Sequence, residues 1–226
     1  MKVRRIHPWN VPYAKARQIQ ESLREGLVSG RLRAKVSNVA GADVSYEKHG
    51  DLFFAGVVIW NVDEEAVIEE KGAVGRVKFP YIPGLLSFRE APVLLEAFRK
   101  IKSPVDAVLV DGQGIAHPRG FGLAAHVSYI LDIPGVGCAK TRLVGEYDEP
   151  GRRRGSRSDL IVDGRKVGVV LRTKDGVKPI FVSPGHRMDV ESAAGLALQC
   201  ATRYRIPEPI RLAHQFVNRM RRQGGI

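Results

Sequence analysis

The sequence contains only two cysteines, Cys138 and Cys200, and no apolar run as long as a membrane span. Two cysteines are too few for a disulfide framework, and they do not show the spacing of a zinc site. A membrane helix needs about 20 consecutive apolar residues. The first residues, MKVRRIHPWN, are too polar for a secretory signal peptide. We therefore expect a soluble, cytoplasmic protein that has no membrane partner.

Acidic residues are also in deficit, because 24 Asp and Glu stand against 36 Lys and Arg and give a formal net charge of +12. Such an excess favours a polyanionic partner, since each phosphate contact releases condensed counterions. An anionic membrane surface is disfavoured, because no basic amphipathic helix stands out as an anchor. The charge thus points to nucleic acid but does not establish it.

The hydrophobic pattern is helical at first, then typical of strands, and then alternates between strands and helices along the chain. Residues 13–28 carry apolar side chains at helical spacing. Three strands are expected at 38–46, 52–60 and 66–71, and their short polar connections are typical of an antiparallel meander. The later expected elements are helices at 87–102, 122–131, 188–203 and 209–222, strands at 106–110 and 135–139, and a hairpin within 158–172 around Asp163-Gly164.

A meander followed by strand–helix alternation predicts an α/β fold. We expect a mixed β-sheet, with an antiparallel meander plus parallel strands, flanked by helices on both faces. No stretch of the sequence looks like a domain boundary, so we expect one domain over residues 1–226. We expect the protein to be a monomer.

Two aspartates interrupt the apolar strands. Asp43 lies within VAGADVS, and a buried carboxylate there needs a partner or a metal ion because an unpaired charge is costly to bury. The alternative is an edge strand with Asp43 facing water. Asp111 follows AVLV at the carboxyl end of a strand, where α/β proteins bind ligands. The alternative is an aspartate that only caps the turn.

Two further candidates have strong structural alternatives. Ser87 and Glu90 have the spacing of a capping box, in which Glu90 would fold back onto the backbone N–H of Ser87. His214 lies beside the packing face of the last helix, where a histidine is more often structural than catalytic. If the strands that carry Asp43 and Asp111 are neighbours, however, both carboxylates can face one metal ion, and the helix can bring Glu90 alongside. Carboxylates suit Mg²⁺, which can activate water and neutralise a scissile phosphate.

Several stretches of the sequence are long and unusual in composition: 39–45 (VAGADVS), 79–90 (FPYIPGLLSFRE), 110–118 (VDGQGIAHP), 137–143 (GCAKTRL), 182–186 (VSPGH) and 205–214 (RIPEPIRLAH). Through these stretches the sequence resembles the endonuclease V family, whose fold is ribonuclease-H-like, along nearly the whole chain. The resemblance implies an Mg²⁺-dependent DNA repair endonuclease, with Mn²⁺ able to substitute. It would hydrolyse the second phosphodiester bond 3′ to deoxyinosine and leave a 3′-hydroxyl and a 5′-phosphate.

The resemblance also implies roles for individual residues. The implied catalytic set is Asp43, Glu90, Asp111 and His214 with Lys140, and the three carboxylates are the implied metal ligands. The implied wedge that separates the DNA strands is Tyr81, with Pro80, Ile82 and Pro83 around it. The expected base pocket comprises Leu86, Gly112, Gly114 and Leu143, and the expected phosphate contacts are Arg89, His117 and Ser183.

The wedge agrees with the physical chemistry of a base that leaves the stack. An aromatic residue on a proline-braced loop can replace lost stacking, and an enzyme that inspects a base must offset the cost of unstacking it. The alternative for Tyr81 is a core aromatic. Two other functions stay open: cleavage of inosine-containing RNA by the same site, and a basic nucleic-acid-binding module without catalysis.

Overall fold

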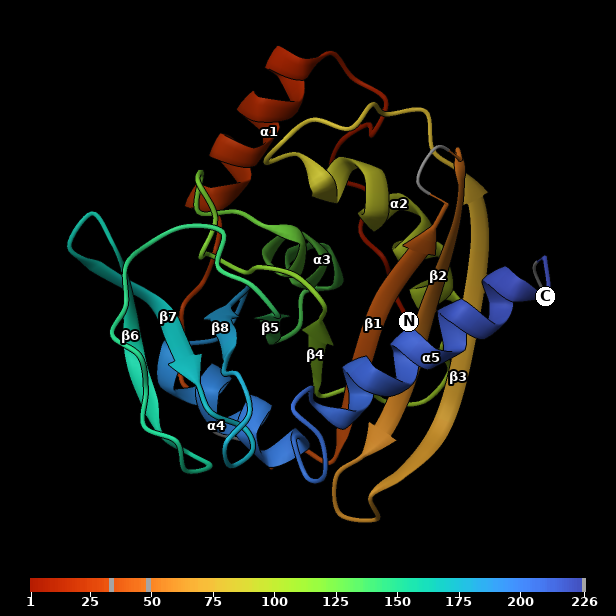
Figure 1. Ribbon diagram of the computed structural model, residues 1–226. Helices are drawn as coiled ribbons and strands as arrows, with labels where there is room; N and C mark the ends of the chain where they lie inside the picture. Colours follow the sequence, from red (N-terminus) through yellow and green to blue (C-terminus); the bar gives the residue numbers. More distant parts are fainter. Residues whose placement is uncertain (33–34, 48–49, 225–226) are drawn as a thin grey trace.

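The computed structural model describes residues 1–32, 35–47 and 50–224, and an eight-stranded sheet runs through it (Figure 1). The elements in chain order are α1 (Tyr13–Glu25), β1 (Asn38–Tyr46), β2 (Leu52–Asn61), β3 (Ala66–Arg76), α2 (Leu86–Arg99), β4 (Ala107–Val110), α3 (Leu123–Leu131), β5 (Gly135–Ala139), β6 (Arg157–Val162), β7 (Arg165–Leu171), β8 (Ile180–Pro184), α4 (Val190–Cys200) and α5 (Glu208–Arg222). The predicted elements are present, and their ends differ by a few residues.

The strand order is β3-β2-β1-β4-β5-β8-β7-β6, and the sheet is mixed. Strands β1, β2 and β3 form the antiparallel meander. Strands β1, β4 and β5 run parallel to one another, and β8, β7 and β6 continue the sheet antiparallel. The predicted ribonuclease-H-like mixed sheet, with a meander and parallel strands, is thereby confirmed.

Strand β8 was not predicted, although it fills the centre of one half of the sheet. It pairs with β5 on one side and with β7 on the other. Its five residues, IFVSP, are too few to show a period, and they end in a proline. The partners of β8 are remote in sequence, so tertiary pairing rather than local preference makes it a strand.

Helices cover both faces of the sheet, as expected (Figure 1). The apolar sides of α2 and α3 pack with β1, β2 and β4 in one core, which includes Leu94, Phe98 and Val127. On the other face, α4 packs against β5, β7 and β8, and α5 crosses β1 and β2. Among the described residues, no helix combines the length and the apolar character that a membrane crossing requires.

Candidate active site

The sheet places Asp43 and Asp111 side by side at the centre of the molecule. Strands β1 and β4 are parallel neighbours, with Ala42 paired to Val110. The next residue on each strand is an aspartate, and the Asp111 N–H donates to the Ala42 carbonyl at 3.2 Å. One ligand atom from each of Asp43, Asp111 and His214 lies within 4.8 Å of the others. The condition set by the sequence, that the two strands be neighbours, is met.

The surroundings of Asp43 disfavour the charged form of its carboxyl group. Burial, and then the negative charge of Asp111, raise the pKa of Asp43 to about 6, although a hydrogen bond with His214 opposes the shift. Asp111 is balanced by Lys140, which comes directly after β5 and whose Nζ lies 2.5 Å from Oδ2 of Asp111. Two carboxylates packed together in this way are expected to attract a cation.

Glu90 lies deep beside this pair. Its side chain on α2 is buried, and burial together with the charges of Asp43 and Asp111 raises the pKa of Glu90 to about 8. Glu90 is not one of the three residues whose ligand atoms lie within 4.8 Å of one another. The structure thus brings the three predicted carboxylates close enough for their charges to interact, although Glu90 is outside the tighter cluster.

The capping-box interpretation of Ser87 and Glu90 is wrong. Helix α2 begins at Leu86 after Leu85, and no side chain caps it. The Ser87 hydroxyl instead lies 3.0 Å from Nδ1 of the buried His126 on α3. The helix therefore starts one residue before Ser87, and Glu90 turns toward the sheet.

Helix α5 brings His214 to the carboxylates because glycines lie beneath it. A Cβ atom on Gly41 would lie 2.0 Å from the Pro209 carbonyl, and one on Gly56 would lie 2.6 Å from Cγ1 of Val217. The missing side chains let the helix axis approach the sheet closely. As a result, Nδ1 of His214 lies 2.7 Å from Oδ2 of Asp43.

Three polar residues that the sequence analysis did not single out support the site. Asn218, one turn after His214, contacts its Nε2 at 3.0 Å, and Ser45 contacts Asn218 at 3.1 Å. Arg205 donates to the carbonyls of Lys140 and Pro179 and so fixes the backbone that carries Lys140. The only sequence signal for Asn218 and Ser45 is their spacing, four residues from His214 and two from Asp43.

The loop before α2 presents Tyr81 to solvent. The Tyr81 side chain is 69% exposed, which excludes the core-aromatic alternative. Its neighbours Pro80 and Pro83 are exposed, and Ile82 is half-buried. The guanidinium of Arg89 donates to the Phe79 carbonyl at 3.1 Å. The structure therefore places Arg89, an expected phosphate contact, as a brace for this loop.

Arg89 is also in contact with aromatic rings. Its Cζ atom lies 5.1 Å from the centre of the Phe53 ring and 6.0 Å from that of Tyr81. Cations are attracted to aromatic faces at such distances. The guanidinium thus connects the exposed tip of the loop to the buried face of the sheet.

Gly114, one of the residues expected in the base pocket, lies in closely packed backbone after β4. A Cβ atom on Gly114 would lie 2.1 Å from the Pro184 carbonyl oxygen, so only glycine fits there. Gly112 and Leu86 are half-buried, and Leu143 is 53% exposed. Between the two glycines, Gln113 is buried, and its Oε1 atom has no hydrogen-bond partner within the described ranges.

Two of the expected phosphate contacts, Ser183 and His117, are buried. Ser183 is completely buried, and its hydroxyl accepts the Gly114 N–H at 2.8 Å, so it holds the loop. His117 is also buried, and its Nδ1 accepts the Arg119 N–H. Burial, and then the positive charge of Arg119, lower the pKa of His117 to about 4. The imidazole is neutral at pH 7 and offers no charge to a phosphate.

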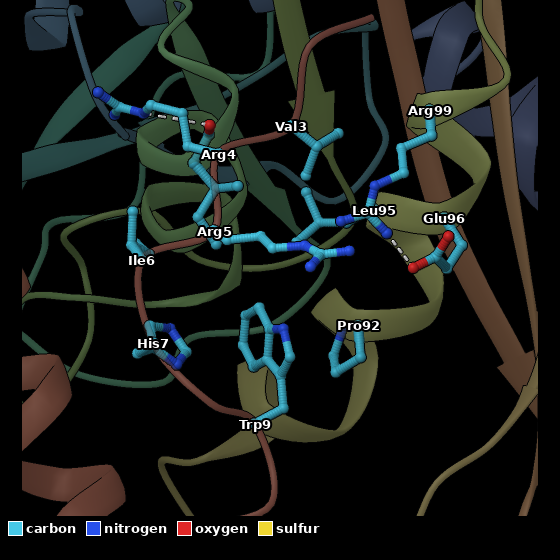
Figure 2. A pocket seen from close by; sticks show the side chains of 11 residues that line it. Val3, Arg4, Arg5, Ile6, His7, Trp9, Pro92, Leu95, Glu96 and Arg99 are labelled. Carbon is cyan, nitrogen blue, oxygen red and sulfur yellow. Dashed lines mark hydrogen bonds and ion pairs between the residues drawn. The ribbon is translucent and has the colours of Figure 1, made fainter.

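A separate hollow of about 270 Å³ lies between the N-terminal segment and α2, and Figure 2 shows the side chains that line it. Arg4, Arg5, Trp9 and Arg99 contribute to its walls, and Arg99 pairs with Glu96. The residues that line it in the described part of the chain include none of the three carboxylates. The hollow is therefore distinct from the candidate active site.

Known proteins are similar to this chain in sequence and in fold. A family model described as Endonuclease V matches residues 21–215. An Endonuclease V of Methanothrix thermoacetophila is 48% identical over 214 residues, which cover 95% of this chain and 94% of the relative. The solved Endonuclease V of Streptomyces avermitilis is 38% identical, with a TM-score of 0.91 and 99% coverage of each chain.

A further solved structure holds nucleic acid. It is Endonuclease V of Ciona intestinalis in complex with a 24mer DNA containing an inosine followed by a ribo-adenosine. It is 28% identical to this chain, with a TM-score of 0.82, and the match covers 93% of this chain and 98% of that one.

Proposed function

The chain belongs to the endonuclease V family and is a nuclease, and from this premise we propose that it cuts DNA at deoxyinosine with Mg²⁺. The bond cut is the second phosphodiester 3′ to the lesion, and the products carry a 3′-hydroxyl and a 5′-phosphate. The observation that carries the proposal is the Asp43–Asp111 pair beside Lys140 and His214. Membership of a nuclease family removes the alternative of a binding module without catalysis.

The donor set fits Mg²⁺, and Mn²⁺ as a substitute. Both nitrogens of His214 already have partners in Asp43 and Asn218, which leaves carboxylate oxygens as the free donors. Mg²⁺ takes oxygen ligands and is often held by one or two carboxylates. Asp43 and Asp111 would hold the ion, and the carboxyl group of Glu90 would add a third negative charge near it. A bound Mg²⁺ supplies Lewis acidity that draws charge from the phosphate and activates water.

The other residues of the site would orient the metal ligands and neutralise negative charge on the phosphate. Lys140 places a positive charge next to Asp111, where a phosphate oxygen can share it. His214 holds the orientation of the Asp43 carboxylate through the contact at Oδ2. Arg205 fixes the backbone of Lys140, so the ammonium group starts from a defined position.

The base is read outside the helix. Tyr81, on a loop braced by Arg89, would fill the gap left by the extruded base. Hypoxanthine carries an N1–H donor where adenine has an acceptor, so an acceptor aimed at that position would favour hypoxanthine. The pocket around it would comprise Gly112, Gly114, Leu86 and Leu143.

The direct test uses a labelled duplex with a single deoxyinosine, incubated with Mg²⁺ or with EDTA. We expect one cut, one nucleotide beyond the lesion, only with Mg²⁺ and only in the labelled lesion strand. A matched duplex with deoxyadenosine should stay intact, and Asp111→Asn should lose the cut while it still binds the duplex. No cut by the parent protein, or a cut that persists in EDTA, would refute the proposal.

A second substrate, inosine-containing RNA, has one specific observation in its favour. The Ciona intestinalis relative was solved with a ribose nucleotide directly after the inosine. A 2′-hydroxyl at that position is thus compatible with binding in a related protein. Cleavage rates on matched DNA, RNA and single-ribose strands will show which substrate is preferred. A protein contact to the 2′-hydroxyl would make the ribose-containing strands the faster substrates.

A further inference from the structure

Four polar side chains form a chain of contacts between β1 and α5. Oδ2 of Asp43 lies 2.7 Å from Nδ1 of His214, and Nε2 of His214 lies 3.0 Å from Nδ2 of Asn218. The hydroxyl of Ser45 lies 3.1 Å from Oδ1 of Asn218. Asp43 and Ser45 are two residues apart on one strand, so they point to the same face, and His214 and Asn218 are one helical turn apart. The chain of contacts therefore starts and ends on β1.

The orientation of the Asn218 amide follows from a second contact. The Asn218 side chain also lies 2.9 Å from the backbone carbonyl oxygen of His214. A carbonyl can only accept a hydrogen bond, so the atom facing it must be the NH₂ group. Oδ1 then faces Ser45, whose hydroxyl can donate to it. Both ends of the amide are thus assigned by chemistry.

The tautomer of His214 follows in turn. The two hydrogens of Nδ2 are directed to the carbonyl and to Nε2 of His214, so Nε2 must accept and carries no proton. A neutral imidazole has one N–H, which must then be on Nδ1. That N–H points at the Asp43 carboxylate, which can only accept when ionised.

We propose that Asn218, oriented by Ser45, is a positioning residue that locks His214 as the Nδ1–H tautomer, whose N–H donates to the Asp43 carboxylate. In this state neither nitrogen of His214 has a free lone pair for a cation. One oxygen of Asp43 is occupied by the histidine, and the other is left for the metal. Asn218 thereby acts through His214 on the ligand geometry of Asp43.

The elements that carry these residues are closely packed. Helix α5 is seated on Gly41 and Gly56, and β1 lies inside the sheet between β2 and β4. A residue on a packed helix can fix the orientation of an imidazole ring more precisely than a loop residue could. Gln215, the exposed residue after His214, is the matched control on the same helix.

The first test uses metal-free protein labelled with ¹⁵N and long-range ¹H–¹⁵N spectra, with His214→Gln to assign the ring signals. We expect the Nδ1–H form in the parent and in Gln215→Ala. Asn218→Ala should allow the Nε2–H form to be populated. Asn218→Asp should favour that form, because a carboxylate at this position can only accept a hydrogen bond from Nε2. Ser45→Ala should give a smaller change in the same direction. An Nε2–H parent, or an unchanged tautomer in both Asn218 variants, would overturn the proposal.

The second test rests on the proposed function and measures cleavage of the deoxyinosine duplex. We expect Asn218→Ala to lower kcat about 10- to 100-fold, with KM within about twofold of the parent, as for other residues that orient a ligand. Gln215→Ala should match the parent. Equal kcat values would overturn the positioning role, provided that circular dichroism shows folded variants. A parent that does not cut deoxyinosine would refute the proposed function alone, because the spectra report the tautomer without substrate.

Discussion

Nδ1 of His214 lies 2.7 Å from Oδ2 of Asp43, although the two residues are 171 positions apart in the sequence. The contact joins the last helix to the first strand at the point where Asp111 also arrives. A residue in the final tenth of the chain thus takes part in a site that begins in the first fifth. The side chain of His214 remains 53% exposed, so the contact contributes to chemistry more than to packing.

A double-mutant cycle on this pair tests whether the two residues act as one unit. We expect His214→Ala and Asp43→Asn each to lower the cleavage rate by about 100-fold, since a metal ligand and the residue that orients it contribute at about that scale. The double variant should lose little beyond the worse single variant. Single-turnover rates with Mg²⁺ provide the measurement. Losses that multiply would show that the residues act independently.

Gly41→Ala should separate the helix from the sheet. The added Cβ would lie 2.0 Å from the Pro209 carbonyl, which is backbone and cannot rotate away. We expect a loss of about 1–3 kcal/mol in the free energy of unfolding, and loss of cleavage as His214 moves from Asp43. Urea unfolding and a cleavage assay provide the two readouts.

Gly195→Ala is the matched control for Gly41→Ala. Gly195 lies inside α4, with open space around the position of a Cβ. Alanine there should stabilise the protein by about 0.5–1 kcal/mol and leave cleavage unchanged. A neutral Gly41→Ala variant would contradict the account of how α5 is seated.

Glu90→Gln should stabilise the metal-free protein at high pH. In the folded state the pKa of Glu90 is about 8, against an ordinary value of 4.5. Below pH 4.5 both states hold the proton, but between 4.5 and 8 the unfolded chain loses it while the folded chain keeps it. The free energy of unfolding of the parent therefore falls as pH rises through this window, and glutamine removes that fall.

The measurement is thermal unfolding in EDTA at pH 5, 7 and 9, for the parent, Glu90→Gln and the exposed Glu96→Gln. We expect the free energy of unfolding of Glu90→Gln to exceed that of the parent by an amount that grows with pH. At pH 9 the difference should be more than about 1 kcal/mol, or about 2–4 °C in Tm. Glu96→Gln should stay within about 0.5 kcal/mol of the parent. If the difference in stability between Glu90→Gln and the parent shrinks as pH rises, the raised pKa of the buried Glu90 would be contradicted. Mg²⁺ should raise the Tm of the parent more than that of Glu90→Gln.

Local patterns predicted most of the fold because most elements have a period of their own. The meander has alternating or apolar strands with short polar connections, and α2 shows its apolar face at helical spacing. Strand β8 lacked such a signal, because five residues cannot show a period and its partners lie elsewhere in the chain. Pairing between remote strands is the part that a local pattern does not contain.

The site was predictable where a polar residue breaks an apolar strand. Asp43 and Asp111 stand out because strands rarely carry an aspartate without a partner. Glu90 did not stand out, since its spacing to Ser87 mimics a cap that the tertiary packing of Ser87 against His126 overrides. Asn218 and Ser45 sit where polar residues are ordinary, so only the three-dimensional contact with His214 gives them a role.

Tyr81→Ala should impair action on duplex DNA more than on single strands. The ring is exposed, so its removal should leave the fold and Tm unchanged. In a duplex the lost stacking at the gap should cost about 1–3 kcal/mol, or roughly 5- to 150-fold in kcat/KM. A single strand needs no separation and should lose less. Tyr13→Ala, which removes an exposed tyrosine on α1, is the control, and equal losses on both substrates would contradict the wedge.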